Sequence, residues 1–367
     1  MKNPSQNSEN RLNNGNKENN NRIENILKKI KDNNYDGMIV SQFNNIFYIS
    51  NYNPSSFAIC LLKEDPIIFT TAMDKELADK TSSIEVQEFK SIADLKNVFK
   101  EENLKKIAIE KNLPIASYKK LISDKAKGEN WDLSIGDFLE KERMIKSHGE
   151  LKNIKKATEI AHESFLEIDI REKQVEKRTD WEIAYELGYL MRANGSSEES
   201  FETIVATASN TSLPHARCEN KELDSIVLMD WGSKFNCYCS DTSRTMIDES
   251  NEKQKEIFDI VLESHNSAID GIKPGIKVCE IDKIARSIIE EYGYGDNFIH
   301  STGHSLGLDI HESPSVSKND ETILEENMVI TIEPGIYLKG EFGVRIEDTV
   351  IVGKNKGEII GNLPYDL

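Results

Sequence analysis

The spacing of apolar positions changes along the chain and predicts where helices and strands lie. After residue 22, IENILKKIKDNN carries apolar residues at helical spacing, and short strand-like runs follow in DGMIV, FAICLL, PIIFTT and KKIAI. Helices and strands alternate in this way to about residue 135, which is typical of a compact α/β domain. No glycine-rich loop of the phosphate-binding kinds interrupts this pattern.

The second part of the chain is predicted to combine long amphipathic helices with strands. In the first of these helices, Leu151, Ile154, Ala157 and Ile160 lie on one stripe. Three more helices are predicted in TDWEIAYELGYLMRANG, EKQKEIFDIVLESHNSAIDGI and VCEIDKIARSIIEEYGYG, with strands between and after them. This pattern indicates an α+β domain in which helices cover one face of a mostly antiparallel sheet. We therefore expect one domain over 23–138 and another over 139–367.

The N-terminal segment has a different composition. Residues 1–22 contain almost no apolar side chains, and nine of them are Asn. Such a segment buries too little surface to offset its ordering entropy, so a disordered Asn-rich tail is predicted.

Composition narrows the class of protein. With 367 residues, 38% hydrophobic and 30% charged, the chain is expected to form a soluble protein of two domains. The net charge of −18 argues against nucleic acid or an anionic membrane as a partner. The chain has no run of about 20 apolar residues and no N-terminal apolar segment typical of a secretory signal. An odd number of cysteines favours reduced thiols and a cytoplasmic location; they are Cys60, Cys218, Cys237, Cys239 and Cys279.

Five potential metal ligands lie in order in the last third of the chain. They are Asp230, Asp241, His304, Glu333 and Glu347, each in a short apolar or glycine-bounded segment. Four carboxylates and one imidazole form a hard, oxygen-rich set, which suits two neighbouring divalent cations better than a single structural zinc. Paired cations activate water towards bonds that resist hydrolysis. Taken alone, an Asp at the end of a strand is most often a turn or capping residue, so the prediction depends on the combination.

Strand geometry supports that combination. Asp241 follows Asp230 by eleven residues, a length that allows a return between antiparallel strands and brings the two carboxylates together. Glu333 stands at the end of one buried strand. Because side chains alternate along a strand, Arg345 and Glu347 in GVRIEDTV lie on one face of the next. An Arg–Glu ladder on a solvated face is the alternative for that last strand. It is a weaker explanation for four strands that all carry acids at the same end.

Two more histidines accompany the ligands. His215 precedes the first ligand strand in NTSLPHARC, and His311 follows His304 by seven residues in HESP. A lone histidine is more often a satisfied polar group than a ligand, but two in one segment strengthen the hypothesis of a metal site. The HE pair is not a zincin motif, because Ser313 and Pro314 follow and no second histidine stands at the required spacing.

The motifs DWG, SDTSRT, GHSLGLDIHESP, TIEPGIY and GVRIED together resemble those of the pita-bread metallopeptidases, in particular Xaa-Pro dipeptidases (prolidases) and aminopeptidase P. The resemblance covers about residues 145–367. Through DGMIVSQFNNIFYISNY it extends, more weakly, to a creatinase-type N-terminal domain over 23–135. It implies an α+β protein with a C-terminal pita-bread domain and an N-terminal creatinase-like α/β domain.

The resemblance also implies roles for the five ligands. Asp230 and Asp241 would hold one metal ion. The second ion would be held by Asp241, His304, Glu333 and Glu347, with Asp241 and Glu347 bridging. A hydroxide activated by the two ions would attack the carbonyl before proline, with Glu333 as proton acceptor.

Other residues match the family with different roles. His215 and His311 correspond to the two substrate-site histidines, which polarise the carbonyl and steady the tetrahedral intermediate. Arg345 is a candidate for supporting a ligand or for binding a substrate carboxylate. The family commonly has GHGxG at the metal histidine, and this chain has Ser305 in place of the second glycine.

The expected function is therefore metal-dependent hydrolysis of proline-containing peptides by a homodimer. The two ions are expected to be Mn²⁺, with Co²⁺ or Zn²⁺ as alternatives. A catalytically inactive binding or scaffold protein and a creatinase-like hydrolase that works without metal remain as alternatives. The complete ligand set favours the peptidase, because a decayed site would be expected to have lost at least one ligand. The sequence leaves open whether dipeptides or longer peptides are cleaved.

Overall fold

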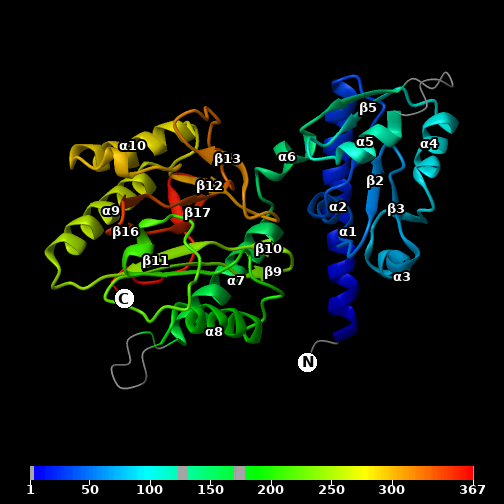
Figure 1. Cartoon of the computed structure of the whole chain (residues 1–367). Helices are drawn as coiled ribbons and strands as arrows, with labels where there is room; N and C mark the ends of the chain where they lie inside the picture. Colours follow the sequence, from blue (N-terminus) through cyan, green and yellow to red (C-terminus); the bar gives the residue numbers. More distant parts are fainter. Residues whose placement is uncertain (1–3, 123–130, 169, 171–177, 367) are drawn as a thin grey trace. The chain divides into compact units, whose positions relative to one another are not determined.

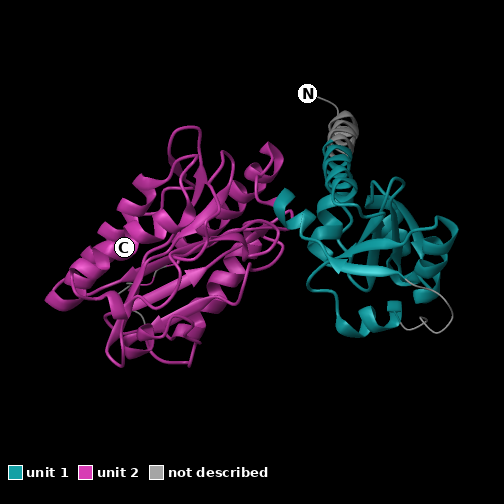
Figure 2. Cartoon of the chain, turned by 90° about the horizontal axis from the view of Figure 1, so that it is seen from above, with its two compact units in different colours: residues 1–142 teal, residues 143–367 magenta. Residues whose placement is uncertain are grey.

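The chain forms two compact units in a computed structural model that describes residues 4–122, 131–168, 170 and 178–366 (Figure 1). The units comprise Met1–Glu142 and Arg143–Leu367 (Figure 2). The division falls four residues after the expected position at 138, because α6 (Phe138–Arg143) continues the first unit up to it.

The first unit contains a six-stranded mixed sheet in the order β4-β3-β2-β1-β5-β6. The central β1 pairs antiparallel with β2 and parallel with β5. The FAICLL and PIIFTT runs, predicted to be strands, form the antiparallel pair β2–β3. The strands are β1 (Gly37–Val40), β2 (Ala58–Leu62), β3 (Ile67–Thr70), β4 (Glu85–Glu88), β5 (Lys106–Ile109) and β6 (Asp132–Ile135).

Helices lie on both sides of this sheet, as predicted for an α/β domain. Leu95 and Phe99 of α4 and Leu121 of α5 pack with apolar side chains of one face, including Ile39 and Leu61. Figure 1 shows α1 and α2 on the other side. The helices are α1 (Pro4–Asp32), α2 (Phe43–Ser50), α3 (Ala72–Thr81), α4 (Ile92–Glu101) and α5 (Ile115–Ile122).

The N-terminal segment differs from the predicted disordered tail over 1–22, because α1 begins at Pro4. Polar contacts of Asn19 and Arg22 hold the end of the segment that was predicted to be disordered. Asn19 is buried and donates from Nδ2 to Ser83 Oγ at 3.2 Å. Arg22 donates to Tyr48 O at 3.0 Å and lies 4.2 Å from the centroid of that tyrosine ring. The first domain therefore includes residues before the expected start at 23.

The second unit is built from antiparallel sheets, and every strand pairing described in it is antiparallel. Two of these sheets carry the candidate site, in the orders β11-β8-β7 and β13-β12-β14-β17-β18. The strands are β7 (Ile204–Thr207), β8 (Val227–Trp231), β9 (Lys234–Phe235), β10 (Tyr238–Cys239), β11 (Thr242–Met246), β12 (Gly303–Ser305), β13 (Glu312–Val316), β14 (Val329–Ile332), β15 (Gly335–Leu338), β16 (Phe342–Arg345), β17 (Asp348–Val352) and β18 (Gly357–Ile359).

All four helices predicted for this unit are present: α7 (His148–Leu166), α8 (Asp180–Ala193), α9 (Glu252–Gly271) and α10 (Val278–Glu291). Capping boxes begin α7 at Ser147 and α8 at Thr179, where each side chain accepts from the backbone three residues on. The helices α7 and α8 cover the sheet that contains β8, and α9 and α10 cover the sheet that contains β17. The predicted α+β architecture is confirmed. Among the described residues, no helix has the length and apolar character that crossing a bilayer requires.

Candidate metal centre

Strand alternation separates helix-facing apolar residues from the candidate ligands. In β8, Met229 and Trp231 pack in the core against α7 and α8, so Asp230 points from the opposite face. In β14 and β17, Ile332 and Val350 pack against α9 and α10. The alternation therefore places the acids on the face that the helices do not cover.

The register of the strands brings three of the acids to one level. Ser243 of β11 lies opposite Asp230 on one side and bridges to Glu347 on the other. In the neighbouring sheet Ile332 pairs with Asp348, so the next residue, Glu333, comes opposite Glu347. Because directly opposite side chains point to the same face, these carboxylates converge.

The remaining ligands complete the cluster. One ligand atom each from Asp241, His304 and Glu347 lie within 4.8 Å of one another. His304 Nε2 lies 3.5 Å from Asp241 Oδ2 and 3.5 Å from Glu333 Oε1. The structure thus brings all five predicted ligands together.

The glycine before His304 is required by the strand packing. A Cβ on Gly303 would lie 1.9 Å from Thr331 O, inside the backbone of β14. Close approach here lets His304 N donate to Thr331 Oγ1 at 3.1 Å. Ser305, by contrast, is accommodated with a fully buried side chain.

The electrostatics of the cluster fit bound cations. Burial and the neighbouring carboxylates raise the pKa of Asp241 and of Glu347 well above the usual range. Burial raises the pKa of Glu333 to about 7, and Asp230 adds to the effect although Arg345 opposes it. Among the described residues, Asp230 Oδ1 and Glu347 Oε1 are buried without a hydrogen-bond partner. Buried carboxylates with unused oxygens are costly unless a cation neutralises them, so this set fits hard divalent ions.

The imidazole of the cluster is held in its ligating form. Burial, with His311 nearby, lowers the pKa of His304 to about 4. A neutral imidazole has a free lone pair, which is the form that binds metal. His304 Nδ1 lies 3.1 Å from Ser305 O, which leaves Nε2 directed at the carboxylates.

Arg345 is committed to groups of the protein. Its Nη2 donates to Asp230 Oδ2 at 2.7 Å, and its Nε donates to Ser243 Oγ at 2.9 Å. Its Nη1 donates to Pro214 O and to Tyr337 Oη, and the side chain is 3% exposed. Of the two predicted roles, this arrangement favours support of Asp230 over binding of a substrate carboxylate.

The two predicted substrate-site histidines lie at the edge of the cluster. His215 and His311 are both exposed. Burial and His215 lower the pKa of His311. The rings of His304 and His311 are 4.4 Å apart between centroids. An exposed pair beside the buried ligands is well placed to meet a substrate.

Sequence reasoning missed several residues of this region. His300 Nε2 lies 2.9 Å from Tyr337 Oη, which joins it to the guanidinium of Arg345. Burial, with Arg345 nearby, lowers the pKa of His300 to about 4. His300 stands four residues before His304, a spacing that could have drawn attention to it. Tyr337 and Ser243 carried no such signal.

Known proteins resemble both units. Residues 152–354 match the model of metallopeptidase family M24, and residues 22–145 match that of the creatinase/prolidase N-terminal domain. The Xaa-Pro dipeptidase of Pyrococcus horikoshii is 38% identical over 340 residues, which cover 92% of this chain and 95% of that protein. The corresponding enzyme of Pyrococcus furiosus is 38% identical over 339 residues, 91% of this chain and 95% of its own.

Solved structures agree with these matches. The prolidase from Pyrococcus horikoshii superposes with a TM-score of 0.88 at 37% identity, over 95% of this chain and 99% of that one. An X-Pro aminopeptidase from Thermotoga maritima gives a TM-score of 0.85 at 33% identity, over 94% and 98%. The chain therefore belongs to metallopeptidase family M24 and carries the creatinase/prolidase N-terminal domain.

Proposed function

We propose that this metallopeptidase is an Xaa-Pro peptidase, which hydrolyses the bond between an N-terminal residue and proline. The observation that carries the proposal is the convergence of Asp241, His304, Glu333 and Glu347 on one buried point, with Asp230 held beside them. The two Pyrococcus relatives bear the name Xaa-Pro dipeptidase, which supports this choice of substrate.

Two divalent cations, Mn²⁺ by preference, would be held by these five residues. Asp230 and Asp241 would hold one ion, and the other would be held by Asp241, His304, Glu333 and Glu347. Bound cations would supply Lewis-acid polarisation of the carbonyl and a lower pKa for a coordinated water. Oxygen-rich sites suit Mn²⁺, and Co²⁺ or Zn²⁺ would also bind.

The protein's own groups would then handle the proton and the developing charge. Glu333, whose Oε1 lies 3.5 Å from His304 Nε2 in the cluster, would accept the proton of the attacking water. His215 and His311 would donate hydrogen bonds to the oxyanion from the exposed side of the cluster. Arg345 would keep Asp230 in place while the substrate binds.

Hydrolysis of Gly-Pro, with and without added Mn²⁺, tests the proposal directly. We expect turnover of Gly-Pro that depends on Mn²⁺ and no comparable turnover of Gly-Ala. A longer peptide that begins Gly-Pro, assayed beside it, separates a dipeptidase from an aminopeptidase. No release of glycine from either proline peptide with Mn²⁺ present would refute the proposal. A Glu333→Ala protein with full turnover would refute the proton acceptor alone.

A homodimer in the cytoplasm is the setting we propose for this activity. All five cysteines lie in the described part of the chain and carry free thiols, as expected for a reducing compartment. Light scattering of the purified protein would measure the mass in solution, and a monomer would contradict the dimer.

A further inference from the structure

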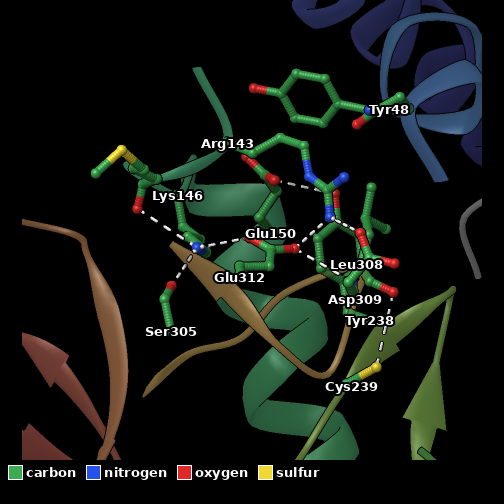
Figure 3. A network of polar contacts seen from close by, with 12 residues as sticks. Tyr48, Arg143, Lys146, Glu150, Tyr238, Cys239, Ser305, Leu308, Asp309 and Glu312 are labelled. Atoms are coloured by element: carbon green, nitrogen blue, oxygen red, sulfur yellow. Dashed lines mark hydrogen bonds and ion pairs between the residues drawn. The ribbon is translucent and has the colours of Figure 1, made fainter. Parts of the chain in front are cut away.

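Four charged side chains and one serine meet beside the metal centre, and the proposed mechanism uses none of them (Figure 3). We call this set the Lys146 cluster. Its members come from the start of the second unit, from β12, from the loop that leads into β13, and from the first residue of β13. They are Arg143, Lys146, Ser305, Asp309 and Glu312.

Lys146 is the centre of the cluster, and its ammonium group uses all three of its donors. Nζ lies 3.1 Å from Ser305 Oγ and 3.1 Å from Glu312 Oε2. The third contact is to Met144 O at 3.4 Å. The side chain is 1% exposed, so its charge is stabilised by these contacts rather than by water.

Glu312 ties the loop before β13 to the same point. Its Oε1 accepts from Arg143 Nη2 and from the backbone N of Asp309. Arg143 Nη2 also donates to Asp309 Oδ2 at 2.7 Å. A Cβ on Gly307 would lie 2.6 Å from Glu312 Oε1, so the carboxylate rests directly on that glycine. Within this set the two cations face two carboxylates, and Figure 3 draws the carboxylate of Glu150 in the same network.

The Lys146 cluster lies at an irregularity in the pairing of β12 with β13, in the segment that contains His304 and His311. The β12–β13 register shifts between His304 and Ser305, so that Ser305 pairs with Glu312. Lys146 bonds to the side chains of this pair. Ser305 directly follows the metal ligand His304, and Glu312 directly follows His311. Whatever fixes Ser305 relative to Glu312 therefore also fixes the two imidazoles relative to each other.

We propose that Lys146, acting through Ser305 and Glu312, is a positioning residue that sets the separation of His304 and His311. The proposal rests on the proposed function, because it takes His304 as a metal ligand and His311 as a substrate contact. It gives the serine of GHSLG a purpose, since a glycine at 305 would offer Lys146 no oxygen. Supporting residues of this kind change metal affinity and turnover without touching the substrate.

The test is Lys146→Met in the full-length protein, which keeps the length of the side chain and removes its charge. We expect kcat on Gly-Pro at saturating Mn²⁺ to fall about 10–100-fold, with a smaller change in KM. We expect the Kd for Mn²⁺, measured by calorimetry on metal-stripped protein, to rise about 10-fold. Ser305→Gly removes only one hydrogen bond, so kcat should fall about 2–10-fold.

Lys63→Met is the matched control. Lys63 lies in the first unit, is 7% exposed, and pairs with Glu102 at 2.9 Å. Its loss should lower stability and leave kcat and Mn²⁺ affinity unchanged. If Lys146→Met behaves in the same way, the cluster is only structural and the proposal is overturned.

The outcomes separate this proposal from the function on which it rests. A wild-type protein that binds Mn²⁺ but releases glycine from neither Gly-Pro nor the longer peptide would refute the proposed function, and the Mn²⁺ affinities would still decide the role of Lys146 at His304. If Lys146→Met does not fold, Ser305→Gly decides. Wild-type kcat together with wild-type Mn²⁺ affinity in that variant would overturn the proposal.

Discussion

Two groups of buried charges lie on opposite sides of the chain where β17 begins. One group contains Glu347 and the other contains the next residue, Asp348. Glu347 points to the metal centre, while Asp348 points to α9 and the C-terminal segment. Asp348 receives Arg244 Nη2 at 2.8 Å and Tyr365 Oη at 2.8 Å, and His265 Nε2 lies 3.3 Å away. We call Arg244, His265, Asp348 and Tyr365 the C-terminal clasp. Both acids are almost fully buried, yet their pKa values move in opposite directions.

The direction of each pKa shift depends on the groups that surround the acid. Burial raises the pKa of Glu347, and the carboxylates of Glu333 and Asp230 raise it further. Burial would also raise the pKa of Asp348, but Arg244 and His265 outweigh it and hold that pKa well below the usual range. The Lys146 cluster follows the second pattern, since Lys146 and Arg143 overcome burial and lower the pKa of Glu312 to about 2. Asp348 and Glu312 are paired with cations of the chain, whereas Glu347 lies among other carboxylates, as expected for an acid that an external cation would neutralise.

Glu347→Gln should have the largest effect on function. Removal of a ligand should lower kcat/KM on Gly-Pro more than about 1000-fold, beyond the roughly 10–100-fold lost with a supporting residue. Because it also removes a repulsive buried charge, the metal-free variant should be more stable at pH 8 than the metal-free wild type, by about 1 kcal/mol or more. Peptidase assays and denaturant unfolding measure the two effects. A metal-free variant less stable than the metal-free wild type would contradict the inference that Glu347, unlike Asp348, destabilises the metal-free fold.

Asp348→Asn should give the opposite result one residue away. The substitution leaves Arg244 buried without its counter-charge, so the free energy of unfolding should fall by roughly 3–5 kcal/mol with Mn²⁺ present. Urea unfolding measures the loss. Glu76→Gln is a suitable control, because Glu76 and Lys80 are 84% and 67% exposed in their pair and its loss should cost less than about 1 kcal/mol. Equal losses in the two variants would show that burial of the pair is unimportant.

The pH dependence of stability should differ with and without metal. Glu333 has a folded pKa of about 7 against 4.5 in the unfolded chain, so the folded state binds more protons between these values. Stability of the metal-free protein should therefore fall as pH rises from about 4 to above 7, by on the order of a few kcal/mol. Asp241 and Glu347 shift in the same direction and add to the fall.

Saturating Mn²⁺ should remove this fall, because bound cations stabilise the ionised carboxylates. Asp348 and Glu312 have lowered pKa values and lose their contribution only below about pH 4, outside this window. Thermal unfolding between pH 5 and pH 8 measures the slope. A metal-free protein that gains stability over this range would contradict the assignment of raised pKa values.

Sequence reasoning predicted that the acids of the candidate metal centre would lie together, because the signals for that arrangement are local. Alternation along a strand identifies the face on which Glu333 and Glu347 lie, and the length between Asp230 and Asp241 allows a return between strands. Distant partners of the residues that adjoin these ligands were not predictable in this way. Arg244 meets Asp348 from 104 residues away, and Lys146 meets Ser305 from 159 residues away.

The same distinction explains the error at the N-terminus. The Asn-rich composition shows that residues 1–22 have few apolar side chains. It does not reveal the hydrogen bond from Asn19 to Ser83 or the contacts of Arg22 with Tyr48. Ser305 is the corresponding case in the second unit. It differs from the family's glycine, and its purpose becomes visible only when Lys146 is placed beside it.

Tyr365→Phe should have the smallest effect and is the finest test of the comparison. It removes the hydrogen bond to Asp348 Oδ2 and keeps the ring against Arg244, whose guanidinium carbon lies 4.8 Å from the ring centroid. The free energy of unfolding should fall by about 1 kcal/mol, and kcat and Mn²⁺ affinity should not change. A loss of turnover without a loss of stability would show that the C-terminal clasp positions Glu347. In that case the two faces of β17 would act as one unit, and the opposite pKa directions would reflect their neighbours without separating their roles.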